Sequence, residues 1–232
     1  MKDFLTSRQD FAADIGISNL YEVIDHFGLY AGFETLGAKF FTYELLKKTL
    51  DVPGDIVEFG CWNGANLLFL AKALYLHSPN TVKKVIGFDN FSGLPEPKPV
   101  DGDYAAEVRG KYTGDEKILR MAIDLFNLSG KVRLVVGDAI QTIPEYRRNH
   151  PEAMISFAFL DFDLYEPTKA ALELLDEALS PGGVVVLDQA GTDQWPGETV
   201  AWLEHMRTSK SGYKPFSNPI TPQPTMAFQK RY

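Results

Sequence analysis

The sequence predicts an α/β protein with a doubly wound, mostly parallel sheet of seven strands, and two observations support this. Two short runs, at residues 155–160 and 184–187, are almost wholly apolar. Such runs are typical of strands that are buried on both faces of a sheet. Strand-like and helix-like segments also alternate along the chain, which favours a parallel sheet with right-handed crossovers.

Residues 1–54 are predicted to form an amino-terminal helical extension. Its first part places Leu20, Val23, Ile24 and Phe27 at helical spacing. A second helix, at residues 36–50, would end before Pro53. Its expected apolar face is Leu36, Phe40, Tyr43, Leu46 and Leu50. The extension would act as a lid over a bound substrate or as an oligomer contact.

Residues 55–232 are predicted to form the main domain. The expected strands are 56–59, 85–88, 132–136, 155–160 and 184–187, followed by an antiparallel pair at 213–216 and 225–230. The expected helices are 65–76, 116–127, 139–148, 167–179 and 198–210. Pro144 should shorten or break the third of these helices. The long polar stretch 90–114 is expected to be a functional lid or a disordered segment.

Length and composition indicate an ordinary globular protein. The 232 residues and 25.9 kDa suit one domain with a full core. A formal net charge of −8 disfavours nucleic acid and anionic membranes as partners. The single cysteine, Cys61, excludes intramolecular disulfides. Without a visible signal peptide or an apolar run of roughly 20 residues, we expect a cytoplasmic protein.

The loop after the first strand predicts the kind of cofactor. Gly60 and Gly64 would let the backbone approach a ligand closely. Trp62 occupies the second glycine position of the Gly-x-Gly-x-x-Gly fingerprint, which disfavours a dinucleotide. Glu58, at the end of the strand, could instead bind an amino group.

Two later strand ends complete the cofactor prediction. Asp89 is placed to accept both hydroxyls of a ribose, and Asp138 with Ala139 would lie beside an adenine. Ribose, adenine and an amino-acid portion together describe S-adenosylmethionine. Gly60 could also be a simple turn, and Asp89 or Asp138 could cap helices. The expected cofactor contacts are Glu58, Gly60, Asn63, Gly64, Asp89, Asn90, Ser92, Asp138, Ala139 and Asp161.

A metal site is predicted where the fourth and fifth strands end. Asp161 and Asp188 follow neighbouring strands that would lie about 5 Å apart, and Gln189 adds an amide oxygen. This oxygen set suits Mg²⁺, which would lower the pKa of a substrate hydroxyl. Asp161 could then accept the proton. Asp163 could be a further ligand, although an acid at a helix entry is the favoured interpretation.

These motifs resemble the macrocin O-methyltransferase family. The resemblance covers about residues 55–205 and rests on the stretches 89–95, 161–167 and 181–188. It implies a class I, Rossmann-like, metal-dependent enzyme that methylates sugar hydroxyls of natural products with S-adenosylmethionine. It also implies that Asp161 and Asp188 bind magnesium with the next residue as third ligand. The family usually has aspartate there, whereas this chain has Gln189; catechol O-methyltransferase also has an amide there and binds magnesium.

Three further side chains are candidates for substrate contact. Arg109, with Lys111 nearby, could bind the phosphate of a nucleotide sugar or could be a solvated loop charge. Trp195 could stack on a sugar ring or cover a core edge. His205 could be an accessory base, although a surface histidine on a helix is the commoner situation.

The sequence thus predicts a magnesium-dependent O-methyltransferase for a small hydroxylated acceptor, with a sugar or glycoside favoured. One alternative is a metal-independent methyltransferase with a base such as His205. A nicotinamide-dependent oxidoreductase is disfavoured by Trp62 and Glu58. A third alternative is a non-catalytic paralogue that binds a nucleotide or serves as a scaffold partner. A homo-oligomer is compatible with the sequence.

Overall fold

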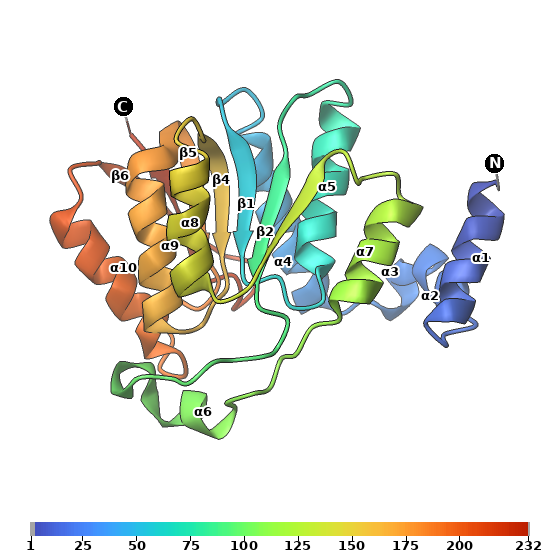
Figure 1. Ribbon diagram of the computed structural model, residues 1–232, viewed down its shortest axis with the longest axis horizontal. Coiled ribbons are helices and arrows are strands. Elements are labelled where there is room, and N and C mark those ends of the chain that lie inside the picture. The colour runs from blue at the N-terminus through green and yellow to red at the C-terminus, as the bar shows by residue number, and fades with distance from the viewer. Residues whose placement is uncertain (1–2, 232) are drawn as a thin grey trace.

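The computed structural model describes residues 3–231, and within them seven strands form a single sheet (Figure 1). The order is β3-β2-β1-β4-β5-β7-β6, with β1 to β5 parallel and β7 antiparallel to both of its neighbours. The strands are β1 (Asp55–Phe59), β2 (Val85–Asp89), β3 (Val132–Val136), β4 (Ile155–Leu160), β5 (Leu179–Leu187), β6 (Tyr213–Ser217) and β7 (Met226–Lys230). The predicted fold class is confirmed.

Helices cover both faces of this sheet (Figure 1). One face packs against α4 (Phe33–Lys47), α5 (Ala65–His77) and α7 (Glu116–Leu125). The other packs against α8 (Ala139–Asn149), α9 (Tyr165–Ala178) and α10 (Pro196–Thr208). Side chains of each central strand alternate between the two cores. In β1, Val57 and Phe59 face α8 and α9, so Glu58 faces α4 and α5.

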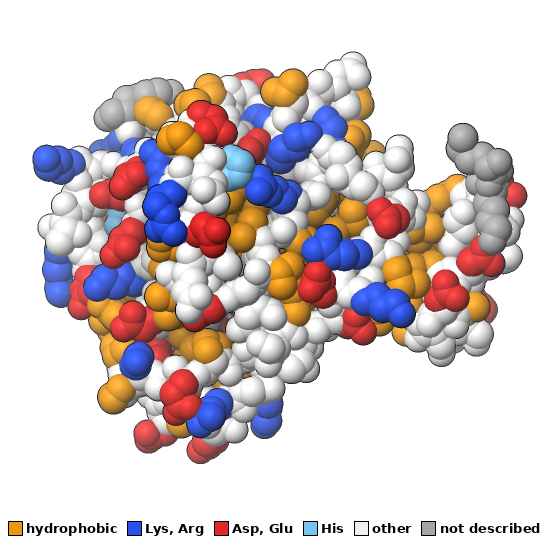
Figure 2. Space-filling view, in the orientation of Figure 1, with side chains coloured by type: hydrophobic (Ala, Val, Ile, Leu, Met, Phe, Trp, Pro, Cys, Tyr) orange, Lys and Arg blue, Asp and Glu red, His pale blue; other side chains and the backbone are white. Residues whose placement is uncertain are grey.

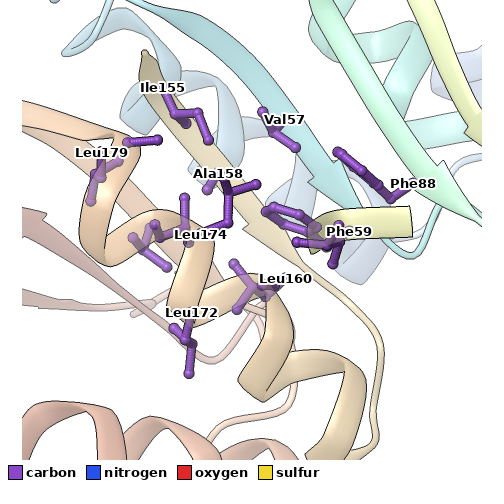
Figure 3. Packing of buried hydrophobic residues seen from close by; sticks show 14 of the residues in the cluster. Val57, Phe59, Phe88, Ile155, Ala158, Leu160, Leu172, Leu174 and Leu179 are labelled. Atoms are coloured by element: carbon purple, nitrogen blue, oxygen red, sulfur yellow. The ribbon is translucent and has the colours of Figure 1, made fainter. Parts of the chain in front are cut away.

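The core between the sheet and α9 is close-packed. Figure 3 shows side chains of β1, β2 and β4 meeting those of α9 and of the start of β5. Phe59 and Phe88 stack with ring centroids 5.2 Å apart. Burying one such large apolar side chain contributes roughly 1.5–3 kcal/mol. The rigid core therefore fixes the carboxyl ends of β1 to β5, where the loops that follow must converge.

Two details of the predicted helices are wrong. Helix α4 buries Gly37, Phe41, Thr42, Leu45 and Leu46, whereas Phe40 is 59% exposed. Leu46 is buried as predicted, and Tyr43 and Leu50 are partly buried, but the buried face is turned around the helix axis away from Phe40. Helix α8 continues to Asn149 through Pro144. Burial of Ile143 and Tyr146, on either side of Pro144, offsets the hydrogen bond that proline cannot donate.

The stretch 90–114 is ordered. It contains η1 (Pro99–Asp101) and α6 (Gly102–Glu107). Ala105 and Val108 pack with Leu164 and Trp195 in a small core of their own, which Leu94 and Tyr104 border. This stretch is therefore held against the body of the protein at the carboxyl edge of the sheet.

The amino-terminal helices divide into two parts. Helix α4 packs into the core, whereas α1 (Phe4–Asp14), α2 (Leu20–Asp25) and α3 (Phe27–Tyr30) project beyond α7 (Figures 1 and 2). Phe4 of α1 meets Phe126 with ring centroids 5.9 Å apart. The prediction of residues 1–54 as one extension stays a prediction. No helix among residues 3–231 combines the length and apolarity needed to cross a bilayer.

Candidate active site

A pocket of about 370 Å³ lies at the carboxyl edge of the sheet. All five parallel strands deliver residues to it through the segments that follow them. Its lining is Gly60, Trp62, Asp89, Asn90, Gly93, Leu94, Pro95, Tyr112, Gly137, Asp138, Ala139, Ile140, Asp161, Phe162, Asp163, Pro167, Gln189, Gln194, Trp195 and Gln223. The carboxyl edge of an open parallel sheet is the general position of ligand sites in this kind of fold.

The pocket brings together only some of the predicted site residues. Those in its lining are Gly60, Asp89, Asn90, Asp138, Ala139, Asp161, Gln189 and Trp195. Those outside the lining are Glu58, Asn63, Gly64, Ser92, Asp188, Arg109 and His205. The sequence pattern predicted where the strands end, but it does not show which side chains of the following loops point into the pocket. Trp62, Tyr112, Gln194 and Gln223 were not predicted to line the pocket.

Gly60 is required by the backbone at the centre of the site. Its φ is +88°, and a Cβ atom there would lie 2.0 Å from the carbonyl oxygen of Asp161. The Asp161 amide in turn donates to the Phe59 carbonyl at 2.8 Å. The ends of β1 and β4 can approach this closely only because residue 60 has no side chain.

Asp89 organises the first loop. Its carboxylate accepts hydrogen bonds from the amides of Cys61 and Trp62, both at 2.7 Å, and of Phe91 at 2.6 Å. A carboxylate has about four lone-pair sites, so one acceptor position is left for a ligand hydroxyl. Asp138 caps α8 by accepting from the Ile140 amide at 3.0 Å. Both acids are thus structural groups that also line the pocket.

Three acids lie together beyond β4 and β5. Burial raises the pKa of Asp161 well above its usual range, and the nearby Asp188 adds to this. Burial raises the pKa of Asp188 to about 7, with Asp163 as the next cause. Burial also raises the pKa of Asp163. Each of the three carboxylates thus raises the pKa of another: Asp188 that of Asp161, Asp161 that of Asp163, and Asp163 that of Asp188.

Asp163 lies between the end of β4 and the start of α9. Its φ is +62°, so the strand does not persist through it, and strand alternation does not relate its direction to that of Asp161. One of its carboxylate oxygens, Oδ1, is buried without a hydrogen-bond partner among the described residues. A strained backbone and an unpaired buried oxygen are both costly, and such features cluster at functional sites.

Two further acids extend this acidic region. Glu58 is 1% exposed, and burial raises its pKa to about 8, although a hydrogen bond from Asn66 acts in the opposite direction. Glu198 accepts from the Gln189 amide at 2.9 Å, and burial raises its pKa. Both have one buried oxygen, Oε2, with no partner in the described part of the chain.

Lys39 is a cation beside these acids that the sequence did not reveal. It lies in α4, and its ammonium donates to Asn66 Oδ1 at 2.8 Å. Burial lowers its pKa, while attraction to Glu58, Asp161 and Asp188 raises it. Lys39 lies three residues after Leu36 and four before Tyr43, on the predicted apolar face of the helix. A lysine among these apolar positions was the available signal.

The predicted metal ligands offer a suitable donor set. Asp161, Asp188 and Gln189 provide hard oxygen atoms of the kind that Mg²⁺ prefers. The unpaired Oδ1 of Asp163 and the raised pKa of Asp161 show an excess of acceptor oxygens that a cation would relieve. Within residues 3–231, no three histidine, cysteine or acidic side chains are grouped as a metal site. Gln189 would therefore have to complete the set.

Aromatic side chains surround the mouth of the pocket. Trp62 and Tyr112 are 52% and 43% exposed, and their rings meet edge to face at 6.1 Å. Both have positive φ, +46° and +63°. Trp195 is only 3% exposed and packs edge to face with Tyr104 at 5.2 Å. It therefore both covers a core edge and contributes to the pocket wall.

Arg109 and His205 lie elsewhere. The Arg109 guanidinium forms a surface ion pair with Glu96 at 2.5 Å. His205, on α10, packs against Trp202 and lies 3.3 Å from the Tyr213 hydroxyl, and burial lowers its pKa. The geometry brings neither side chain to the pocket.

The strand order and the pocket across the ends of β1 to β5 define the class of Rossmann-like methyltransferase folds. An O-methyltransferase from Bacillus cereus, solved with S-adenosylhomocysteine, shares this fold with a TM-score of 0.57 at 16% identity, covering 99% of this chain and 100% of that one. The macrocin O-methyltransferase family model matches residues 44–212, and the chain belongs to this family.

More similar relatives carry names within natural-product biosynthesis. A tetracenomycin rhamnosyl 4′-O-methyltransferase of Streptomyces olivaceus is 31% identical over 147 residues, 61% of this chain and 55% of that protein. The demethyldecarbamoylnovobiocin O-methyltransferase of Streptomyces niveus is 28% identical over 60% of this chain and 53% of its own length. The matches thus span little more than half of each relative. The calicheamicin methyltransferase CalS11 superposes with a TM-score of 0.78 at 27% identity, covering 97% of this chain and 91% of that one.

Proposed function

We propose that this protein transfers a methyl group from S-adenosylmethionine to a hydroxyl of a sugar carried by a natural product or its precursor. One observation carries the proposal. A single pocket joins Gly60, Asp89 and Asp138 on one side to Asp161 and Gln189 on the other. A methyl donor held by the first group would place its reacting end beside the second. The name of the tetracenomycin relative, which includes a rhamnosyl group, and the description of CalS11 as a TDP-rhamnose 3′-O-methyltransferase support a sugar acceptor.

The cofactor half of the pocket would recognise a nucleoside. Asp89 has one free acceptor position for a ribose hydroxyl after its three backbone hydrogen bonds. Asp138 and Ala139 would lie beside the base, with the apolar Ile140 against its face. Asn90 and Ser92 belong to the adjoining turn, in which the Ser92 amide donates to Asn90 Oδ1 at 2.7 Å.

The acid half would activate the acceptor. Asp161, Asp188 and Gln189 would hold Mg²⁺, which when bound lowers the pKa of an alcohol. Asp161 lines the pocket, and we assign to its carboxylate the acceptor proton. Trp62 and Tyr112 at the mouth would pack against the sugar and exclude water from the reacting atoms.

Calorimetry is the first test of this function. S-adenosylhomocysteine should bind, and NAD should not. Turnover of labelled S-adenosylmethionine should then be measured with a panel of rhamnosides and nucleotide-activated deoxysugars. A protein that binds NAD and not S-adenosylhomocysteine would overturn the proposal.

Two further experiments test the roles of the metal and of Asp161 in turnover. Asp161→Asn should lower kcat by about 100-fold or more, because a general base typically contributes that factor. Asp51→Asn, at an exposed turn before β1 at the opposite edge of the sheet, should leave kcat unchanged. Chelation should abolish turnover, and added Mg²⁺ should restore it. Full activity under chelation would favour a metal-independent methyltransferase.

A further inference from the structure

Glu198 is a buried acid that the proposed function does not use. It lies in the first turn of α10, is fully buried, and is not part of the pocket lining. An acid in the first turn of a helix commonly interacts with the helix dipole, but this role needs no burial. A fully buried carboxylate is costly unless it is paired. The burial of Glu198 therefore indicates a role beyond the start of its own helix.

The side chain of Glu198 reaches the segment that follows β5. Its Oε1 accepts from the backbone amide of Gln189 at 2.9 Å. The Gln189 carbonyl accepts from the Thr192 amide at 3.1 Å and from the Thr192 hydroxyl at 2.8 Å. The Gly191 amide donates to the Thr199 hydroxyl at 2.8 Å. Both backbone groups of Gln189 are thus held, and the start of α10 fixes the turn after β5.

Electrostatic effects place Glu198 close to the acids that would hold the metal. Burial raises the pKa of Glu198, and the charges of Asp188, Asp161 and Asp163 raise it further. Its second oxygen, Oε2, is buried without a hydrogen-bond partner among the described residues. A bound divalent cation would reverse these effects, because it is the largest charge in such a site and favours the charged form of nearby carboxylates.

Gln189 is the one predicted metal ligand that carries no charge. Asp161 and Asp188 each bring a carboxylate, whereas Gln189 offers only an amide oxygen. We propose that Glu198 supplies the negative charge that Gln189 lacks, from the position behind Gln189 at which it also holds the backbone of this ligand. Glu198 is therefore a positioning residue that acts on the cation without contacting it. This inference rests on the magnesium site of the proposed function.

The competing role of Glu198 is to hold the turn after β5 by its hydrogen bond alone. Glu198→Gln separates the two roles, because an amide oxygen can still accept from the Gln189 backbone while the charge is lost. A hydrogen bond alone would leave the affinity for the cation unchanged in this variant. A charge that supports the cation would not.

Binding of Mn²⁺ alone, measured by electron paramagnetic resonance, tests this without turnover, because Mn²⁺ takes the same oxygen ligands as Mg²⁺. Glu198→Gln should raise the Kd of Mn²⁺ by about 10- to 100-fold, the range for a residue that supports a metal ligand from behind. The Kd of S-adenosylhomocysteine should stay within about twofold, which shows that the variant is folded. Glu204→Gln is the matched control, since Glu204 is exposed on the same helix and accepts from the Tyr165 hydroxyl at 2.7 Å. It should change neither Kd.

Gln189→Asp provides the sharper test, because it places a carboxylate at the ligand position itself. In the wild type it adds one more acid to a region that already has the third charge, so the Kd of Mn²⁺ should change by less than about threefold. In Glu198→Gln it replaces the lost charge and should recover at least about tenfold in affinity. A gain of about tenfold or more in the wild type would show that the third charge was missing, and would overturn the inference.

Two other results would also overturn it. One is an unchanged Kd of Mn²⁺ in Glu198→Gln, and the other is a Gln189→Asp change that fails to recover the affinity of that variant. Wild-type protein that binds S-adenosylhomocysteine but no Mn²⁺ would overturn the metal site and this inference, and would leave methyl transfer as the function. Wild-type protein that binds neither would overturn the proposed function itself.

Discussion

Single residues in this site serve structure and ligand together, which limits what their identity predicts. Asp89 and Asp138 were predicted from their places after β2 and β3, with helix capping as the alternative role. Asp138 does cap α8, and Asp89 holds three loop amides, yet both line the pocket. A strand-end position can be read from sequence, but the hydrogen bonds of a carboxylate depend on neighbours that are distant in the chain. Lys39 is the clearest case of such a distant neighbour.

Glu58 leads to a prediction about pH. Its pKa is raised by burial to about 8 in the folded protein, against an ordinary value of 4.5. Between these values the folded state holds a proton that the unfolded state has released, so stability falls as pH rises through this window. Glu58→Gln removes this contribution. We expect the wild type to lose of the order of 1–3 kcal/mol more than the variant between pH 5.5 and pH 8.5.

Urea unfolding of the ligand-free protein at the two pH values measures this difference. Glu145→Gln, at an exposed position of α8, is the control and should behave like the wild type. Asp161, Asp163 and Glu198 also have raised pKa values, so the decline should be reduced in Glu58→Gln and not removed. Equal declines in Glu58→Gln and wild type would contradict the assignment to Glu58.

At the scale of elements, six of the seven strands were predicted to within one residue at each end, because each is a short run with turn residues beside it. Strand β5 instead begins at Leu179, five residues before its predicted start, and runs through Ser180 to Gly183. The helices were predicted less exactly. Of the predicted face of α4 only Leu46 is fully buried, because apolar spacing alone does not tell which side of the helix meets the sheet. Burial of Ile143 and Tyr146 could not be weighed against Pro144 without the neighbouring α9. The packing of 90–114 depends on Leu164 and Trp195, which are distant in sequence.

Asp101 is the residue that attaches this segment to the body. Its carboxylate is buried and accepts from the Lys98 amide at 2.6 Å and from the Tyr165 amide at 2.7 Å. Gly197 of α10 leaves room for it, because a Cβ there would lie 2.0 Å from Asp101 Oδ1. Asp101→Ala should cost about 2–4 kcal/mol, since two partly buried amide hydrogen bonds are lost.

Limited trypsin digestion reports on this attachment. Cleavage after Arg109 or Lys111 should be faster in Asp101→Ala, because the segment opens locally before the protein unfolds. Asp103→Ala, exposed on α6, should be cleaved at the wild-type rate. Similar cleavage rates in both variants would mean that the small core around Trp195 holds the segment without Asp101.

At the scale of the whole molecule, the topology was the most informative prediction about the site. Parallel strands deliver their ends to one edge, and Asp161 with Gln189 lie there as expected. Glu58 and Asp163 were singled out from their places after β1 and β4, whereas Glu198 was not, because it joins this acidic region only when α10 packs beside β5. The role of the amino-terminal helices was left open between a lid and an oligomer contact.

Removal of residues 1–31 tests how those helices relate to the rest. Helices α1 and α2 are joined to each other by the ion pair of Arg8 and Asp25 at 2.9 Å, while many of their large apolar side chains are exposed. Every residue that lines the pocket, and Lys39 beside it, lies beyond the deletion. We therefore expect the shortened protein to fold, and to bind S-adenosylhomocysteine within about threefold of the full-length Kd, a difference below 1 kcal/mol.

Leu46→Ala provides the contrast within α4. Leu46 is fully buried against the sheet, and its truncation should cost about 2–5 kcal/mol. If the deletion lowers the unfolding midpoint as much as Leu46→Ala does, the projecting helices stabilise the core directly. A raised acceptor KM with unchanged cofactor affinity would instead identify them as a lid, because a lid contacts the acceptor without touching the donor site. A smaller sedimentation coefficient than the lost mass explains would identify an oligomer contact.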